Sequence, residues 1–144
     1  MKMKSSYEVL SSVIKTTQMG QIGIRSVLNA PVNTEMQQAL HSQLNEYDAI
    51  EREAYEIAHA RGWEPKELDL GIKAMTNMMT RMRLCYGDTT SKAAAMMVNG
   101  NTRGVIKGLK NLHNFEGKDE RVTGLARKLL DCEEENIKQM QRFI

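Results

Sequence analysis

The sequence predicts an all-α protein, an antiparallel bundle of five helices that forms one domain over residues 1–144. Apolar residues recur at alternating steps of three and four in five separate stretches, which is the spacing of a helix with one buried face. Short turn sequences that contain Gly, Pro, Asn or Asp separate these stretches. No stretch shows the alternation of a half-buried strand.

The longest stretch, residues 33–61, is predicted as the central helix of the bundle. Asn33 or Thr34 can cap its start, Glu35 lies in its first turn, and Gly62 supplies its stop. Its core-facing positions are Met36, Leu40, Gln43, Tyr47, Ile50, Ala54 and Ile57.

The other four helices follow from similar signals. The first spans about residues 5–28, and the fourth runs from the Asp-Thr-Thr turn at residues 88–90 to His113. A third helix is expected from Pro65, which suits a first helical turn, to Tyr86, with Gly87 ending it. The fifth helix begins at Asp119 and runs to the C-terminal end.

Composition limits the classes of function. The net charge is only +2, but residues 35–70 are mainly acidic and residues 71–115 mainly basic. A basic segment invites a nucleic-acid interpretation, yet packing of the acidic helix against the basic ones is favoured, because aromatic residues for base stacking are few. We expect no membrane span, no signal peptide and a cytoplasmic location. Cys85 and Cys132 are expected to be buried free thiols.

Four of the five apolar seams are interrupted by polar residues near mid-helix. Short turns hold antiparallel helices level, so we expect these residues to meet in one layer and to hydrogen-bond to one another. A polar layer at the waist of a bundle is also where carboxylate-bridged metal centres are built. The residues concerned are Gln21, Gln43, Glu46, Asn101, Glu133 and Asn136.

With these waist positions, the chain resembles the ferritin-like superfamily, which includes rubrerythrins and many small bacterial bundle proteins. In its di-iron members, two helices supply a Glu each and two supply Glu-x-x-His pairs. Here the fifth helix reads Glu133-Glu-Glu-Asn136, with Asn in place of His, and Gln21 stands where a Glu is expected. The resemblance implies a four-helix core made by the first, second, fourth and fifth helices, with the second and fourth running parallel.

Two interpretations of the layer compete. In one it is a hydrogen-bond network that holds no metal or other cofactor. In the other, Glu46 and Glu133 form a weak site for iron or manganese. The network is favoured, because a working iron site normally uses imidazole or several carboxylates. The one true Glu-x-x-His, Glu56 to His59, points away from the core face by helical phase.

Glycines recur at every fourth position of the fourth helix, at Gly100, Gly104 and Gly108. Because Gly is costly inside a helix, something should approach closely there. The alternatives are a neighbouring helix, with the Met-rich third helix preferred, a second subunit or an elongated apolar ligand. We expect a homodimer.

No catalytic motif is visible, so a non-enzymatic function is favoured over an enzyme. The leading interpretation is a self-associating structural or interaction protein of a bacterium. The alternative is a metal-binding ferritin-like protein that acts in iron oxidation or storage.

Overall fold

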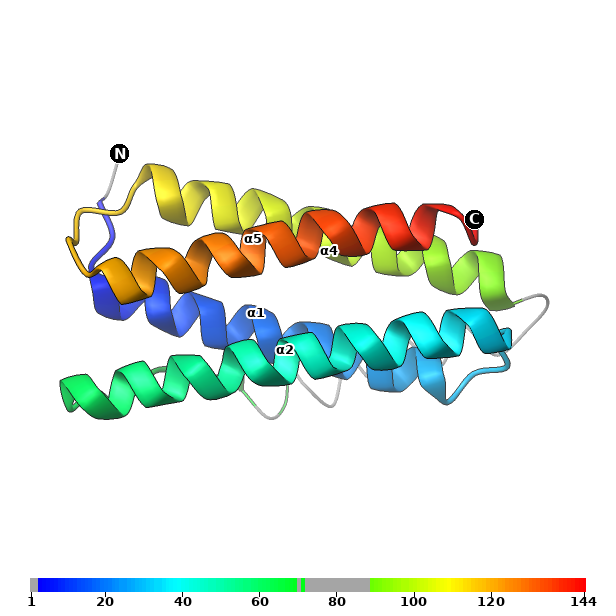
Figure 1. Ribbon diagram of the computed structural model, residues 1–144, viewed down its shortest axis with the longest axis horizontal. Coiled ribbons are helices and arrows are strands. Elements are labelled where there is room, and N and C mark those ends of the chain that lie inside the picture. The colour runs from blue at the N-terminus through cyan, green and yellow to red at the C-terminus, as the bar shows by residue number, and fades with distance from the viewer. Residues whose placement is uncertain (1–2, 70, 72–88) are drawn as a thin grey trace.

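The computed structural model describes residues 3–69, 71 and 89–144. These residues form four α-helices, α1 (Ser6–Leu28), α2 (Thr34–Arg61), α4 (Thr89–His113) and α5 (Glu120–Gln141), which lie side by side in one elongated bundle (Figure 1). The all-α prediction is confirmed. The predicted count of five helices is wrong, because the described part of the chain contains four. Most of the expected third helix, at residues 70 and 72–88, lies outside the described residues.

The start of that expected helix is described and is not helical. Residues 63–69 form no regular structure. The Ser11 hydroxyl accepts a hydrogen bond from the Lys66 amide at 3.1 Å, and the Gln18 side-chain carbonyl accepts one from the Leu68 amide at 3.0 Å. Side chains of α1 therefore satisfy backbone amides of this non-helical segment, and Pro65 does not begin a helix.

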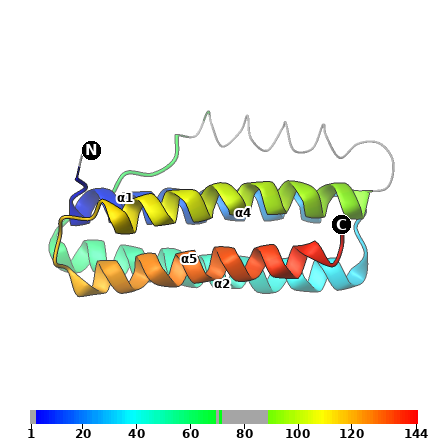
Figure 2. The same cartoon turned by 90° about the horizontal axis from the view of Figure 1, so that it is seen from above.

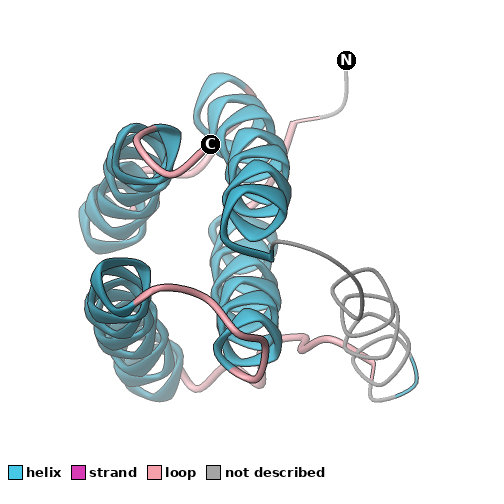
Figure 3. Cartoon of the chain, turned by 90° about the vertical axis from the view of Figure 1, so that its right-hand side faces the viewer, coloured by secondary structure: helices cyan, strands magenta, loops and turns pink. Residues whose placement is uncertain are grey.

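The four helices occupy the corners of a square when the bundle is viewed from its end (Figure 3). Around the square the order is α1, α2, α5 and α4, and each neighbouring pair is in contact. The colour gradient in Figures 1 and 2 shows that neighbours run antiparallel. Consequently α2 and α4, at opposite corners, run parallel, as the resemblance implied.

Capping residues set the helix ends close to where the sequence predicts them. Ser5 and Glu8 form a reciprocal capping box at the start of α1. The Asn33 side chain accepts a hydrogen bond from the Met36 amide at 2.8 Å and caps α2. Gly62 ends α2 in the left-handed conformation, with φ of 69°.

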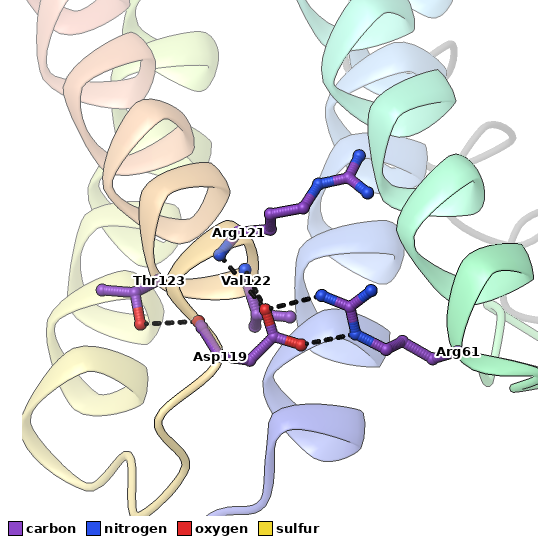
Figure 4. A network of polar contacts seen from close by, with 5 residues as sticks. All are labelled: Arg61, Asp119, Arg121, Val122 and Thr123. Atoms are coloured by element: carbon purple, nitrogen blue, oxygen red, sulfur yellow. Dashed lines mark hydrogen bonds and ion pairs between the residues drawn. The ribbon is translucent and has the colours of Figure 1, made fainter.

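An ion pair joins α2 to α5 at one end of the bundle (Figure 4). Nε and Nη2 of Arg61 lie 2.8 and 3.1 Å from the two carboxylate oxygens of Asp119. Asp119 also caps α5 by accepting hydrogen bonds from the amides of Arg121 and Val122. The hydrogen bond from Arg61 lowers the pKa of Asp119 below its usual value. The residue that starts α5 therefore also holds the end of α2.

The apolar seams meet along the bundle axis and form one core. On α2, the seam is apolar toward both ends but carries Gln43 and Tyr47 near its middle, and both are buried. The buried polar side chains of α2 thus lie at the waist. None of the helices in the described residues combines the length and apolar character needed to cross a bilayer.

Candidate functional site

The phenol of Tyr47 lies at the centre of the buried waist. Its oxygen is 2.7 Å from Oε1 of Glu133, 3.2 Å from Oδ1 of Asn101 and 3.5 Å from Nδ2 of Asn136. Cys132 lies 3.7 Å from the same Asn136 nitrogen. We call these five residues, from α2, α4 and α5, the polar cluster. All five are buried, and Glu133 is only 2% exposed.

Sequence reasoning missed the role of Tyr47, which it counted as an ordinary member of the α2 seam. The available signal was its chemistry. A buried tyrosine hydroxyl usually requires a hydrogen-bond partner. Its position one helical turn from Gln43 pointed to the same polar level.

Burial raises the pKa of Glu133 to about 7, although the hydrogen bond with Tyr47 opposes this shift. A phenol has only one proton to donate. When Glu133 is protonated, its acid donates to the Tyr47 oxygen and Tyr47 donates to Asn101, so both contacts are satisfied. When Glu133 is ionised, Tyr47 donates to the carboxylate, and the Asn101 carbonyl loses its donor. The neutral carboxylic acid therefore fits the observed arrangement best.

The thiol of Cys132 connects the cluster to the surface of the bundle. It donates to Oε2 of Glu46 at 3.1 Å, and Glu46 itself is exposed. Burial, followed by the hydrogen bond to Glu46, raises the pKa of the Cys132 thiol well above its ordinary value. Cys132 is a free, buried cysteine, whereas Cys85 lies outside the described residues. The thiol is therefore protonated and unreactive at neutral pH.

The six polar residues singled out in the sequence do not form one connected layer. Nε2 of Gln21 donates to Glu51 at 3.1 Å, and Nε2 of Gln43 donates to Gln139 at 2.9 Å, so each glutamine has a partner outside the cluster. Asn101, Glu133 and Asn136 share Tyr47 as a partner, and Glu46 reaches the cluster only through Cys132. Helical phase predicts the face of a residue, but a long side chain turns toward whichever neighbouring helix offers a partner.

The donors do not fit an iron or manganese centre. Among the described residues, no three His, Cys, Asp or Glu side chains gather closely enough to hold a metal ion. Glu133 shares its proton with a phenol, and Glu46 turns toward a thiol. Such centres prefer imidazoles or several ionised carboxylates. Glu56 and His59 are both exposed on the outer face of α2.

A groove of about 690 Å³ runs between α1 and α4 and reaches the polar cluster. Gly20 and Gly23 line it from α1, and Gly100 and Gly104 line it from α4. A Cβ atom on Gly20 would lie 2.6 Å from the Tyr47 ring, and one on Gly104 would lie 2.7 Å from the Glu133 carboxyl carbon. These two glycines therefore make room for the cluster.

The remaining glycines show what approaches α4. Among the described residues, a Cβ on Gly23 or Gly100 would meet no atom within 4 Å. A Cβ on Gly108 would lie 3.3 Å from Leu130 of α5. Of the described helices, α5 is therefore the close neighbour of the glycine series at two positions, Gly104 and Gly108, while most of the expected third helix lies outside the described residues.

Asn101 brings a buried donor to the lining of the groove. The residue is 3% exposed, and its Nδ2 atom has no hydrogen-bond partner among the described residues. At one end, the described lining residues are mainly cationic, with Lys4, Lys15, Lys66 and Lys107 against Glu8. Toward the other end the lining is apolar, with Val27, Met96 and Met97. The groove thus has a cationic end, a polar middle and an apolar end.

Comparisons with models of protein families, with curated proteins and with solved structures gave no match for this chain. Functional inference accordingly depends on the geometry of the polar cluster and the groove.

Proposed function

We propose that the protein is a non-enzymatic binding protein whose α1–α4 groove takes a small, largely apolar ligand with a hydrogen-bond acceptor. The observation that carries this proposal is Asn101, a groove-lining residue whose buried Nδ2 atom has no hydrogen-bond partner among the described residues. A buried donor without a partner costs about 1–3 kcal/mol. An acceptor on a ligand would remove that cost.

The groove has the other attributes of a ligand site. Small-molecule sites typically enclose about 300–1,000 Å³, are lined mainly by apolar groups and contain a few convergent polar groups. Here the volume is about 690 Å³, and the lining includes Asn101, Tyr47 and Glu133 of the polar cluster in addition to the charged groups at one end. The raised pKa of Glu133 supports the same location, because perturbed titratable groups concentrate at functional sites.

A binding role suits the cluster better than catalysis. Burial raises the pKa of both Tyr47 and Cys132, so the two potential nucleophiles keep their protons at neutral pH. Neither is hydrogen-bonded to a histidine in the described part of the chain, and the carboxylates beside them are Glu133 and Glu46. The metal-binding alternative is disfavoured by the donor set around Glu46 and Glu133.

Three expectations from the sequence remain part of the proposal. The antiparallel neighbours and the parallel α2 and α4 support kinship with the ferritin-like superfamily.

Ile106 and Leu109, exposed on α4 by 49% and 40%, offer an apolar surface for a homodimer. Light scattering that found only the 16.3 kDa monomer at micromolar concentration would count against self-association. We retain a cytoplasmic location, with nucleic acid disfavoured as a partner.

Titration calorimetry with N-methyldecanamide, a neutral probe with one carbonyl acceptor, tests the binding role. We expect saturable binding to the wild type, weakened about tenfold by Asn101→Leu, which removes the donor. Asn99→Leu is the matched control, because Asn99 is exposed on the same helix and does not line the groove. Circular dichroism would confirm that both variants fold. Absence of binding to the wild type, or equal binding by the Asn101 variant, would overturn the proposal.

A further inference from the structure

We infer that the ligand of the groove is a single-chain anionic amphiphile in which an acyl carbonyl separates the anionic head group from the aliphatic chain. N-acyl amino acids and acyl glycerophosphates share this chemistry. The inference rests on the proposed function and adds the head group and the direction in which the ligand lies.

The cationic end of the groove is built by both helices. Lys15 comes from α1 and Lys107 from α4. The two helices are tied together near this end, because Nζ of Lys4 donates to Oδ1 of Asn111 at 2.6 Å and Nδ2 of Asn111 donates to the Ser12 hydroxyl at 2.9 Å. Ammonium groups from both sides of the groove therefore line this end.

These cations repel one another. Burial and the charges of Lys107 and Lys110 lower the pKa of Lys4, and Glu8 opposes this effect only in part. An anionic group placed among the lysines would offset the repulsion and gain charge-assisted hydrogen bonds. Charge complementarity therefore assigns the head group to this end.

The opposite half of the groove suits an aliphatic chain. Beyond Asn101, its described lining consists of Gly23 and Val27 from α1 and of Met96, Met97 and Gly100 from α4. Methionine side chains adapt to flexible apolar ligands. A Cβ at Gly23 or Gly100 would meet no atom of the described residues within 4 Å, so these residues leave space for a chain to lie against both helices.

The position of Asn101 requires a polar group between head and chain. Asn101 precedes Lys107 by six residues and follows Met96 by five, which corresponds to roughly 9 Å and 8 Å along the axis of α4. The carboxylate of a simple fatty acid can reach Asn101 or the lysines, but it cannot occupy both places. An acylated anion has a carbonyl for Asn101 and a separate charge for Lys15 and Lys107.

Titration calorimetry with N-decanoylglycine, below the concentration at which it forms micelles, tests this inference. Two comparison probes isolate its parts. The methyl ester lacks the charge, and tridecanoate has the same chain length without the internal carbonyl. At low ionic strength we expect N-decanoylglycine to bind about tenfold more tightly than either probe, and added salt to reduce its advantage over the ester.

A double variant, Lys15→Gln with Lys107→Gln, tests the position of the head group. We expect it to bind N-decanoylglycine no more tightly than the methyl ester, and to bind the ester as the wild type does. Lys138→Gln is the control, because Lys138 is exposed on α5 and does not line the groove. Its affinity for both probes should be unchanged.

The possible failures are distinguishable. Equal binding of the acid and its ester would overturn the anionic head group while leaving the proposed function intact. Tridecanoate that binds as tightly as N-decanoylglycine would overturn the internal carbonyl. Binding that weakens as protein concentration rises would assign the groove to a second copy of the chain and overturn the amphiphile. If no probe binds, including N-methyldecanamide, the proposed function fails as well.

Discussion

The two sides of the bundle that flank the polar cluster differ in how they enclose it. Between α2 and α5, long side chains fill the space, with Gln43 paired to Gln139 and Glu46 paired to Cys132. Between α1 and α4, glycines occupy the facing positions at the same level, and the groove reaches Tyr47 and Glu133. One side closes over the cluster, and the other leaves a route to it.

The difference shows that polarity and access are set by different residues. The polar groups that make the cluster come mainly from α2 and α5. The space beside them depends on residues of α1 and α4 that have no side chain. A search for polar or charged residues alone would therefore find the cluster but not the groove.

The largest expected effect concerns the buried acid. Glu133→Gln should resemble the protonated state, because the amide can donate to Tyr47 as the acid does. The pKa of Glu133 is about 7 in the folded chain, against an ordinary 4.5. Between these values the unfolded chain releases the proton and the folded chain keeps it, so the stability of the wild type should fall as the pH rises.

The variant should therefore unfold at a similar free energy near pH 4.5 and be more stable than the wild type by about 3 kcal/mol above pH 7. Urea unfolding at several pH values measures this difference. A difference that does not change with pH would mean that Glu133 titrates as an exposed glutamate.

A smaller effect is expected on the α1–α4 side of the cluster, where the groove lies. Gly20→Ala should lower the free energy of unfolding by about 2 kcal/mol, because the new methyl group would overlap the Tyr47 ring. Gly23→Ala is the matched control on the same helix. Its methyl group meets no atom of the described residues within 4 Å, so the better helix propensity of Ala should stabilise the protein by about 1 kcal/mol. Urea unfolding of both variants gives the comparison, and equal effects would refute the role assigned to Gly20.

The α2–α5 side of the cluster, which long side chains close, should contribute to the stability of the fold without contributing to ligand binding. Gln43→Leu breaks the bond to Gln139 but also removes Oε1 of Gln43, a buried acceptor without a partner. We therefore expect a loss of only about 1 kcal/mol in urea unfolding. The affinity for N-methyldecanamide should be unchanged. Weakened binding would show that the closed side shapes the groove.

The smallest effect is expected at the end of the bundle, away from both sides. Asp119→Asn should keep the cap of α5 and lose only the ion pair with Arg61. Because Arg61 lowers the pKa of Asp119, the pair contributes stability above the ordinary aspartate pKa of 3.8 and loses it as the pH falls. Thermal unfolding should show a slightly less stable variant at neutral pH and no difference in acid. A difference that persists in acid would contradict the ion-pair explanation.

Local signals predicted much of the fold. The ends of α2 followed from Asn33 and Gly62, and the start of α5 followed from Asp119, because capping depends on neighbouring residues only. The start of the expected third helix could not be predicted in this way. Its amides bond to Ser11 and Gln18, which are 55 and 50 residues earlier in the chain.

The candidate site was predicted only in part. Phase along each helix identified Asn101, Glu133 and Asn136 as buried polar positions. It could not show that Tyr47 would join them. The position of a residue along the seam predicts which face of the helix it lies on, but not which group its hydroxyl bonds to. For the groove, the sequence offered only the glycine series of α4, for which an elongated apolar ligand was one of three alternatives. The extent of the groove could not be predicted, since the spacing between α1 and α4 depends on how all four helices pack.

The central claim is that Glu133 is buried from water yet lies beside a groove that a ligand can enter. Carbon-13 NMR of the glutamate carboxyl groups, with Glu133→Gln for assignment, tests both halves. We predict that Glu133 titrates with a pKa of about 7, and that bound N-decanoylglycine raises this pKa further by excluding the remaining water. A pKa near 4.5 in the free protein, or a titration that the bound ligand leaves unchanged, would contradict the account.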